Sequence, residues 1–298
     1  MNHAVQFQNV RKQYSHFNLD LETLSLPTGS IMGFIGANGA GKSTTLRLLM
    51  GLVDQDSGKI EVLGHDVPKQ ATNAKWNIGY VSEDMRLYGA ATLEWHMDFM
   101  RSIFKNWDEN YAKHLLKTFD LRANQNLKGF SHGQRVKAAL LLVLARRPKL
   151  LVLDEPTTGL DPIARSEVLG ELMAVLADEQ RSVLFSSQNT LDVEQISDQI
   201  TFIDRGRIVN SSDKESYLQR WRRVRLELPN NTKLPNFPEV ISSNGDGRLV
   251  VITTDRYSSE INAKYNALGA TVRSVDTMTL EEIFVANVQN RRKERDAA

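Results

Sequence analysis

The sequence predicts an α/β fold with a mixed β-sheet, an N-terminal antiparallel β part, a helical insert and a small α+β C-terminal domain. Three observations lead to this prediction. Short apolar runs at 30–35, 150–153 and 182–186 are typical of strands covered on both faces, and segments of helical periodicity lie between them. The chain opens with alternating apolar and polar residues. Its composition changes after about residue 208.

The first predicted elements are strands. Residues 5–10 and 19–22 alternate apolar and polar side chains, which is the pattern of half-exposed antiparallel strands. The apolar run at 30–35 ends in a glycine-rich turn, and apolar residues recur at helical spacing from 43 to 52. We therefore expect the order strand, loop, helix at the start of the α/β region.

Two helices are predicted between the first and second buried strands. Residues 92–104 and 111–119 have helical periodicity, and Thr92 and Asp108 are placed as their N-caps. We expect these helices to belong to a helical insert at about 85–135.

A domain boundary is predicted near residue 213. The first domain is expected at 1–212, a small α+β extension at 213–289 and a basic tail at 290–298. Thr279 and Glu282 have the spacing of a capping box that begins the last helix. The other expected elements of the extension are strands at 224–228, 249–253 and 271–275 and a helix at 258–268.

Arginines cluster at the beginning of this extension. This cluster favours a solvated strand edge, and contact with anionic lipid head groups is the alternative. Its members are Arg220, Arg222, Arg223 and Arg225.

The composition is that of an ordinary folded, soluble protein. Of 298 residues, 41% are hydrophobic and 24% are charged, and 37 Lys and Arg nearly balance 36 Asp and Glu, so we expect no nucleic-acid partner. The longest apolar run, 138–145, is far shorter than the roughly 20 residues that span a membrane, and the first residues do not resemble a secretory signal. The chain lacks cysteine, which excludes disulfides. We expect a cytoplasmic protein.

Residues 36–43, Gly-Ala-Asn-Gly-Ala-Gly-Lys-Ser, fit the phosphate-loop pattern G-x-x-x-x-G-K-[ST]. The motif lies after a predicted buried strand and before a predicted helix, where backbone N–H groups and the helix N-terminus bind phosphates. Lys42 is expected to reach the β- and γ-phosphates, and the Ser43 hydroxyl to ligate Mg²⁺. The candidate nucleotide-binding residues of this segment are Gly36, Asn38, Gly39, Ala40, Gly41, Lys42, Ser43 and Thr44.

The predicted strand at 150–153 ends in two consecutive carboxylates, Asp154 and Glu155. Open α/β sheets bind ligands at the carboxyl ends of their strands. We expect Asp154 to hold Mg²⁺ through water and Glu155 to polarise the water that attacks the γ-phosphate. The alternative is a solvated turn with both carboxylates pointing outward, which the preceding apolar residues disfavour.

Further motifs resemble those of the ATP-binding cassette family. Residues 130–134, Phe-Ser-His-Gly-Gln, are similar to the family signature LSGGQ and lie between the phosphate loop and the acidic strand. Residues 159–162 are similar to the D-loop, and 186–188 stand at the switch position. Tyr14 matches the aromatic residue that stacks on adenine in the family. The resemblance covers residues 1 to about 212.

The resemblance implies a head-to-tail pair of nucleotide-binding domains that sandwich two ATP molecules with Mg²⁺. Ser131, Gly133 and Gln134 would contact the nucleotide held by the partner's loop, and Asp161 would belong to the same site. The partner domain is either a second copy of this chain or a second cassette subunit. The implied catalytic residues are Lys42, Glu155 and Gln188.

Three residues depart from the family pattern. His132 replaces a glycine of the signature, and Glu83 replaces the Q-loop glutamine, where a carboxylate is still able to ligate Mg²⁺. Gln188 replaces the switch histidine, and an amide carries no charge and shuttles no proton near neutral pH. We therefore hypothesise slow hydrolysis and a long-lived ATP-bound dimer.

A single cassette without a membrane span resembles the separate ATPase subunit of a transporter. Residues 106–108 and 279–284 resemble subunits paired with ABC-2-type exporter permeases, which implies a protein held at the inner face of the membrane by its permease. The alternative function is a cytosolic ATP-dependent clamp or regulatory protein with slow hydrolysis. A small-molecule P-loop kinase is disfavoured by the signature and by Glu155 next to Asp154.

Overall fold

The computed structural model describes residues 3–178, 180–229, 237, 239–245 and 248–296, without the side chains of 259 and 291–296. The chain forms two compact units, Met1–Ser211 and Ser212–Ala298. The basic tail predicted at 290–298 lies largely outside this description, because the side chains from 291 onward and residues 297–298 are not included.

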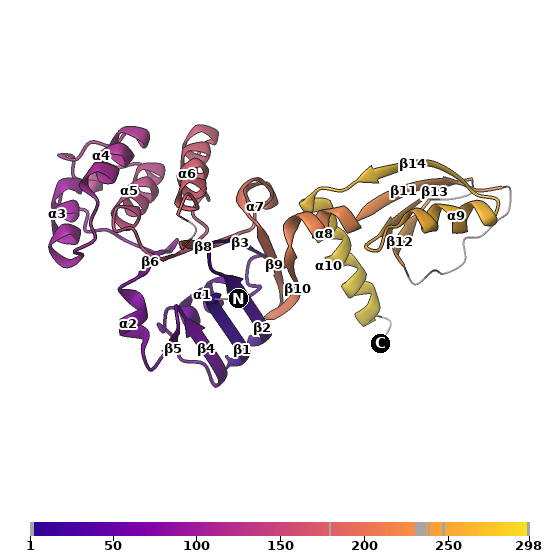
Figure 1. Cartoon of the computed structure of the whole chain (residues 1–298), viewed down its shortest axis with the longest axis horizontal. Helices are drawn as coiled ribbons and strands as arrows, with labels where there is room; N and C mark the ends of the chain where they lie inside the picture. Colours follow the sequence, from indigo (N-terminus) through magenta and orange to yellow (C-terminus); the bar gives the residue numbers. More distant parts are fainter. Residues whose placement is uncertain (1–2, 179, 230–236, 238, 246–247, 297–298) are drawn as a thin grey trace. The chain divides into compact units, whose positions relative to one another are not determined.

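The N-terminal unit begins with a four-stranded antiparallel sheet in the order β2-β1-β4-β5 (Figure 1). Phe7 of β1 lies opposite Leu24 of β2 and Ile60 of β4, and all three are buried. The alternating pattern at 5–10 and 19–22 is thus confirmed as strand, because its apolar positions face a common core. The strands are β1 (His3–Gln13), β2 (Asn18–Pro27), β4 (Ser57–Val62) and β5 (His65–Val67).

The second sheet of this unit has six strands in the order β10-β9-β3-β8-β7-β6. The pairs β3–β8, β3–β9, β7–β8 and β6–β7 are parallel, so these strands end at the same edge. Every residue of β3, β7 and β8 is buried, which explains their continuous apolar runs. The strands are β3 (Ile31–Ile35), β6 (Ile78–Val81), β7 (Leu150–Asp154), β8 (Ser182–Ser187), β9 (Gln199–Asp204) and β10 (Arg207–Asp213).

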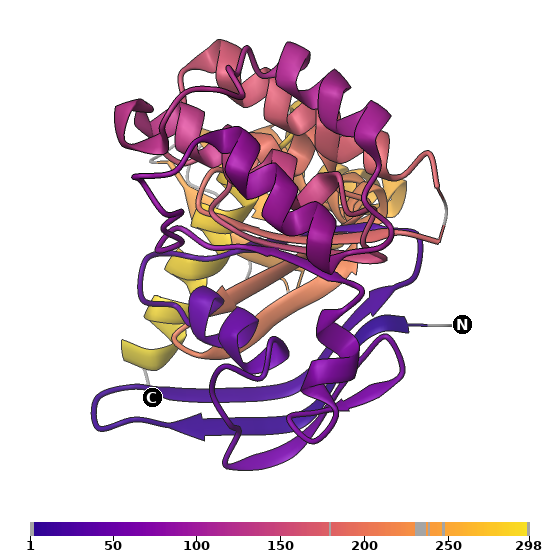
Figure 2. The same ribbon diagram turned by 90° about the vertical axis from the view of Figure 1, so that its left-hand side faces the viewer.

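Helices cover both faces of the six-stranded sheet. Helix α1 contacts β4 and β7, so it lies between the two sheets, whereas α5, α6 and α7 contact the six-stranded sheet on its other face (Figures 1 and 2). The predicted α/β class is confirmed. The helices are α1 (Lys42–Leu49), α2 (Ala71–Lys75), α3 (Leu93–Ile103), α4 (Glu109–Thr118), α5 (His132–Leu144), α6 (Pro162–Val175) and α7 (Thr190–Ile196), with a 3₁₀ turn at Leu127–Gly129.

The predicted helix starts are confirmed by their capping contacts. The Thr92 hydroxyl accepts from the Trp95 N–H at 3.1 Å, and Asp108 accepts from the Tyr111 N–H at 2.9 Å. These contacts satisfy N–H groups that have no partner within the helix.

The C-terminal unit is a four-stranded antiparallel sheet in the order β12-β13-β11-β14 with helices. Val224 and Leu226 of β11 pack with Ile261 and Tyr265 of α9 in a separate core. The elements are α8 (Lys214–Arg220), β11 (Arg222–Glu227), β12 (Val240–Asn244), β13 (Leu249–Thr254), α9 (Ser259–Ala267), β14 (Thr271–Thr277) and α10 (Leu280–Asp296).

The expectation of a strand edge at the arginine cluster is wrong. Strand β11 pairs with β13 on one side and β14 on the other, so it is a central strand. Arg223 pairs with Glu282 at 3.0 Å and Arg225 with Asp276 at 3.2 Å. The acidic partners come from elements more than 50 positions later in the chain, which local composition does not reveal.

Candidate nucleotide site

The phosphate loop connects the buried strand β3 to helix α1. Gly41 precedes the helix with φ of 114°, a left-handed conformation that glycine adopts readily. A Cβ on Gly36 would lie 2.6 Å from the carbonyl oxygen of Ile203, so only glycine fits this close approach. The first turn of α1 contains no acidic residue, and its N-terminus is therefore left positive for an anion.

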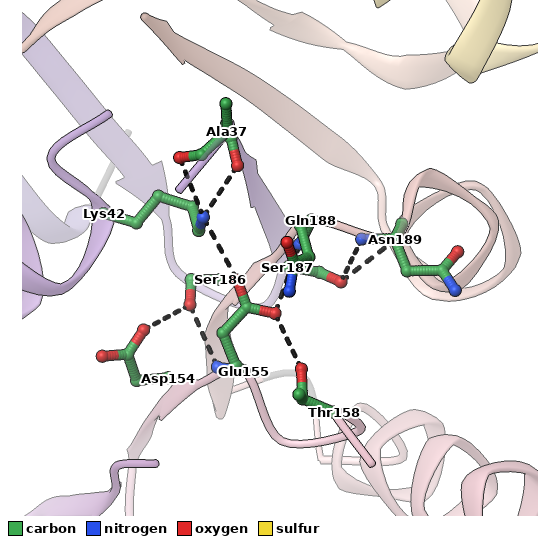
Figure 3. A network of polar contacts seen from close by, with 10 residues as sticks. Ala37, Lys42, Asp154, Glu155, Thr158, Ser186, Ser187, Gln188 and Asn189 are labelled. Carbon is green, nitrogen blue, oxygen red and sulfur yellow. Dashed lines mark hydrogen bonds and ion pairs between the residues drawn. The ribbon is translucent and has the colours of Figure 1, made fainter. Parts of the chain in front are cut away.

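Lys42 is held in this loop by three oxygens. Its Nζ donates to the carbonyls of Gly36 at 2.7 Å and Ala37 at 3.3 Å, and lies 3.2 Å from Oε1 of Glu155 (Figure 3). The side chains of Lys42 and Glu155 are only 6% and 7% exposed. The sequence motif predicts the lysine, but its ion pair with Glu155 depends on the sheet, in which β8 lies between β3 and β7 and all three strands end at the same edge.

The two carboxylates occupy the carboxyl end of β7. Asp154 Oδ1 accepts from the Ser186 hydroxyl at 2.6 Å, and the same oxygen of Ser186 accepts from the Glu155 N–H at 3.0 Å (Figure 3). Glu155 has φ of 52°, a left-handed conformation that is uncommon for a residue with a side chain. Asp154 is 5% exposed and the Glu155 side chain 7%, which contradicts the alternative of a solvated turn with both carboxylates pointing outward.

The Glu155 carboxylate also accepts hydrogen bonds from Thr158 and from residue 188 of the switch segment. Its Oε2 accepts from the Thr158 hydroxyl at 3.1 Å and from the Gln188 N–H at 3.3 Å (Figure 3). The contact from Gln188 comes from its backbone, and its side chain is exposed. The structure therefore brings Lys42, Glu155 and Gln188 together at one edge of the sheet.

A pocket of about 410 Å³ lies over the phosphate loop. Glu83 and Glu155 line it together with His16 and Phe17, two residues that belong to no recognised sequence motif. Tyr14, predicted to stack on adenine, is 42% exposed and does not line this pocket. The loop residues that line the pocket are Ala37, Asn38, Gly39, Gly41, Lys42, Ser43 and Thr44.

The only local signal for Phe17 is its position in the hairpin between β1 and β2. Its ring lies 3.0 Å from where a Cβ of Gly41 would stand, so the ring packs against the phosphate loop. An aromatic residue at this place is able to stack on a flat base.

The predicted signature residues lie at the start of α5, away from this pocket. The Ser131 hydroxyl accepts from the Gln134 N–H at 3.2 Å, and the Gln134 side chain accepts from the Ser131 N–H at 2.9 Å, which completes a capping box. Gly133 lies in the first turn of the same helix. His132 Nε2 lies 3.1 Å from the carbonyl oxygen of Thr158.

Asp161 is the N-cap of α6 and also lies outside the pocket. Its Oδ1 accepts from the N–H groups of Ala164 and Ile163 at 3.0 Å each. The hydrogen bond from Ala164, followed by that from Ile163, holds the pKa of Asp161 below its ordinary value. Capping of α6 therefore explains an aspartate at this position without any contact to a second chain.

A glycine loop at a helix N-terminus, a buried lysine and an acidic pair at the carboxyl end of β7 in the same sheet define a P-loop nucleoside triphosphatase site. Comparison with known proteins identifies the family. Residues 19–158 match the family model described as "ABC transporter".

Curated relatives extend this similarity along the chain. The chain is 26% identical over 275 residues to the ABC transporter ATP-binding protein YtrB of Bacillus subtilis (strain 168). This match covers 91% of this chain and 93% of YtrB. It is 32% identical over 222 residues to the linearmycin resistance ATP-binding protein LnrL of the same organism, and this match covers 72% of this chain and 71% of LnrL.

A solved structure described as "Structure of ATP binding subunit of ABC transporter" has the same fold. Its TM-score is 0.65 at 25% identity, and the match covers 72% of this chain and 92% of that one. The chain therefore belongs to the ATP-binding cassette (ABC) transporter family. It binds ATP and is an ATPase of the ABC type.

Proposed function

We propose that this ATPase is the subunit that drives a separate integral membrane permease of the ABC-2 type, as an exporter. The observation that supports this most directly is the combination of the Lys42–Glu155 site with the signature segment at 130–134 in one unit. Relatives named as a transporter ATP-binding protein and a resistance ATP-binding protein support the transport role. Within the described residues, no helix has the length and apolarity that a membrane crossing requires.

The phosphate loop would hold the nucleotide through its backbone N–H groups and Lys42. An incoming γ-phosphate competes with Glu155 for the Lys42 ammonium, because both are anions for the same buried cation. Glu155 would then be freed from this ion pair while Thr158 and the Gln188 N–H still orient it. In that arrangement Glu155 is the base that polarises the attacking water.

The donor set at this edge fits Mg²⁺. The Ser43 hydroxyl and Glu83 line the nucleotide pocket, and Asp154 is held by Ser186 beside it, so all three supply the hard oxygens that Mg²⁺ prefers. In the described part of the chain, no three carboxylate or imidazole groups form a ready cation site, so nucleotide phosphates would supply further ligands. Bound Mg²⁺ would neutralise charge on the transferring phosphoryl group.

The signature segment would complete the site of a second cassette. Ser131 and Gly133 begin α5, whose N-terminus is suited to an anion, and neither lies at the chain's own nucleotide pocket. We therefore propose a head-to-tail dimer, with a second copy or another cassette subunit, in which Ser131, Gly133, Gln134 and Asp161 serve the partner's ATP. Tyr14 would stack on adenine as the family resemblance implies, with Phe17 beside the loop.

The permease would dock near Glu83. A pocket of about 570 Å³ lies between the segment that follows Glu83 and helix α5. Met85 and Leu87 line it on one side and Val136 on the other. Met85 and Tyr88 are 40% and 67% exposed, which leaves apolar surface for a cytoplasmic segment of the permease. This contact would hold the subunit at the inner face of the membrane.

The experiment that tests this proposal measures mass in solution with ATP and Mg²⁺ for the natural chain and for Glu155→Gln. ATP should convert monomer to dimer, and the dimer should persist in Glu155→Gln but dissolve as the natural chain hydrolyses ATP. Ser131→Arg, which places bulk and charge at the start of α5, should bind ATP and remain monomeric. ATP binding with neither dimer formation nor hydrolysis in the natural chain would overturn the motor function.

A further inference from the structure

A second pocket of the N-terminal unit lies at the opposite edge of the six-stranded sheet. It has a volume of about 300 Å³. Asn77 precedes β6 and Pro148 precedes β7, so this pocket lies at the amino ends of two parallel strands, whereas Glu155 follows the carboxyl end of β7. The length of β7 separates the two edges by roughly 16 Å. The pocket is therefore distinct from the nucleotide site.

Arg146 is the central cation of this pocket. Its guanidinium carbon lies 3.4 Å from the centroid of the Phe104 ring, and Nη2 reaches the Trp76 carbonyl only at 3.4 Å. Its Nε is buried and has no hydrogen-bond partner among the described residues. Burial lowers the pKa of Arg146 to about 10, so the group is still charged at neutral pH. A half-buried cation normally pairs with an acid, because burial without a partner costs free energy.

The charge around Arg146 is positive. The other lining residues include Lys105 and Arg147, and of these three cations only Arg147 has an acidic partner, Asp108, at 2.8 Å. In the part of the chain that the structure describes, no carboxylate lines the pocket, and neither Arg146 nor Lys105 forms an ion pair. Two uncompensated cations therefore face one small pocket.

The remaining wall is flat and apolar, with amides at its margin. Trp76 is 56% exposed and meets Phe104 edge-to-face at 5.5 Å between centroids. Ile103 adds aliphatic surface, and Asn77 and Asn106 add amide groups. An exposed tryptophan beside an apolar wall suits a flat ring, and amide N–H groups suit an anionic oxygen.

We infer that this pocket binds a small organic oxyanion with a flat apolar body, and that Arg146 and Lys105 recognise its charge. The Phe104 ring occupies one face of the guanidinium, and its Nη N–H groups have no carboxylate partner among the described residues, so they are left to donate to an oxyanion. Trp76 packs against the body of the ligand. The site is independent of ATP chemistry and would give the subunit a second small-molecule ligand.

The test uses 2-naphthoate as probe for the full chain, with saturating ADP so that the phosphate loop is occupied. Ligand-observed NMR and calorimetric titration should give a Kd of about 1 mM or tighter. Neutral 2-naphthamide has the same flat body and should bind at least about tenfold more weakly, because it lacks the charge that Arg146 recognises. Cyclohexanecarboxylate keeps the charge but lacks the flat body, and it should also bind more weakly.

Two variants locate the site. Arg146→Met should weaken binding of 2-naphthoate by about tenfold or more and should not change binding of the amide. Lys105→Glu changes an exposed residue, so folding is unaffected, and it should weaken binding even if Arg146→Met does not fold. Lys117→Met, an exposed lysine of α4 outside the pocket, is the matched control and should bind as the natural chain does.

Three results would overturn the inference. Equal affinity for 2-naphthoate and 2-naphthamide would show an apolar patch without charge recognition. Unchanged affinity in Lys105→Glu and in folded Arg146→Met would place the probe elsewhere. Absence of binding up to 10 mM would exclude an organic oxyanion site. None of these results bears on ATP-driven dimer formation, which is measured separately.

Discussion

Two buried or half-buried cations lie at opposite ends of β7 and differ in how the chain compensates them. Lys42, near the carboxyl end, contacts the Glu155 carboxylate and two carbonyl oxygens. Arg146, near the amino end, contacts the ring of Phe104 and one distant carbonyl. Both belong to the same unit and the same sheet.

The difference shows that, among the described residues, the chain supplies an anion for Lys42 at one edge and none for Arg146 at the other. At the carboxyl edge, Glu155 compensates the charge of Lys42, and under the proposed function a nucleotide phosphate would replace it. At the amino edge, the positive charge of Arg146 and Lys105 has no such partner in the described chain. Under the two proposals, an anion replaces Glu155 at the first edge and is added beside Arg146 at the second.

The largest expected effect is on hydrolysis in Glu155→Gln. The amide keeps the shape of the side chain but is not a base, so the rate of phosphate release should fall by about two to four orders of magnitude. ATP affinity should be kept, because Lys42 and the loop are intact. A rate within a factor of ten of the natural chain would show that Glu155 is not the base.

The second largest effect is on stability in Lys42→Met. Removing one partner of a buried ion pair leaves Glu155 uncompensated, so the free energy of unfolding without nucleotide should fall by about 3–5 kcal/mol. Urea denaturation measures this loss. The double variant Lys42→Met/Glu155→Gln removes both charges and should recover much of it. If the double variant is as unstable as the sum of the single changes, the pair is not coupled.

An intermediate effect is expected for Gln188→His. The backbone N–H of residue 188 still orients Glu155, while the imidazole adds a group able to move a proton, so turnover should rise by about tenfold or more. The variant should also acquire a pH dependence between about pH 5 and 8. Gln188→Asn is the matched control and should stay slow. A rate at or below that of the natural chain would contradict slow hydrolysis caused by Gln188.

The smallest effect is expected on stability in Arg146→Met. No ion pair is broken, and the methionine side chain still packs on Phe104, so the free energy of unfolding should change by less than about 1 kcal/mol. Urea denaturation beside Lys117→Met provides the measurement. A loss of unfolding free energy as large as that of Lys42→Met would show that Arg146, like Lys42, has a charge partner that stabilises the fold. The two edges would then not differ.

Local patterns in the sequence predict much of the fold. Thr92 and Asp108 begin helices as expected, because capping requires only residues within one helical turn. The strands β4, β5, β6, β9, β10 and β12 are not identified from the sequence. Several of these are short or partly exposed, so neither a continuous apolar run nor a clean alternation marks them.

The sequence by itself determined the phosphate loop, the acidic strand end and the α/β class. Each of these depends only on residues adjacent in the chain or on the spacing of apolar residues along it. Only the tertiary structure decided that Lys42 pairs with Glu155, that Ser186 holds Asp154 and that Phe17 packs on the loop. It also decided that Arg146 lies on Phe104 with no acidic partner among the residues that the structure describes. These contacts join positions 24 to 113 residues apart, and distance in space between such positions is set by packing, which no local pattern encodes.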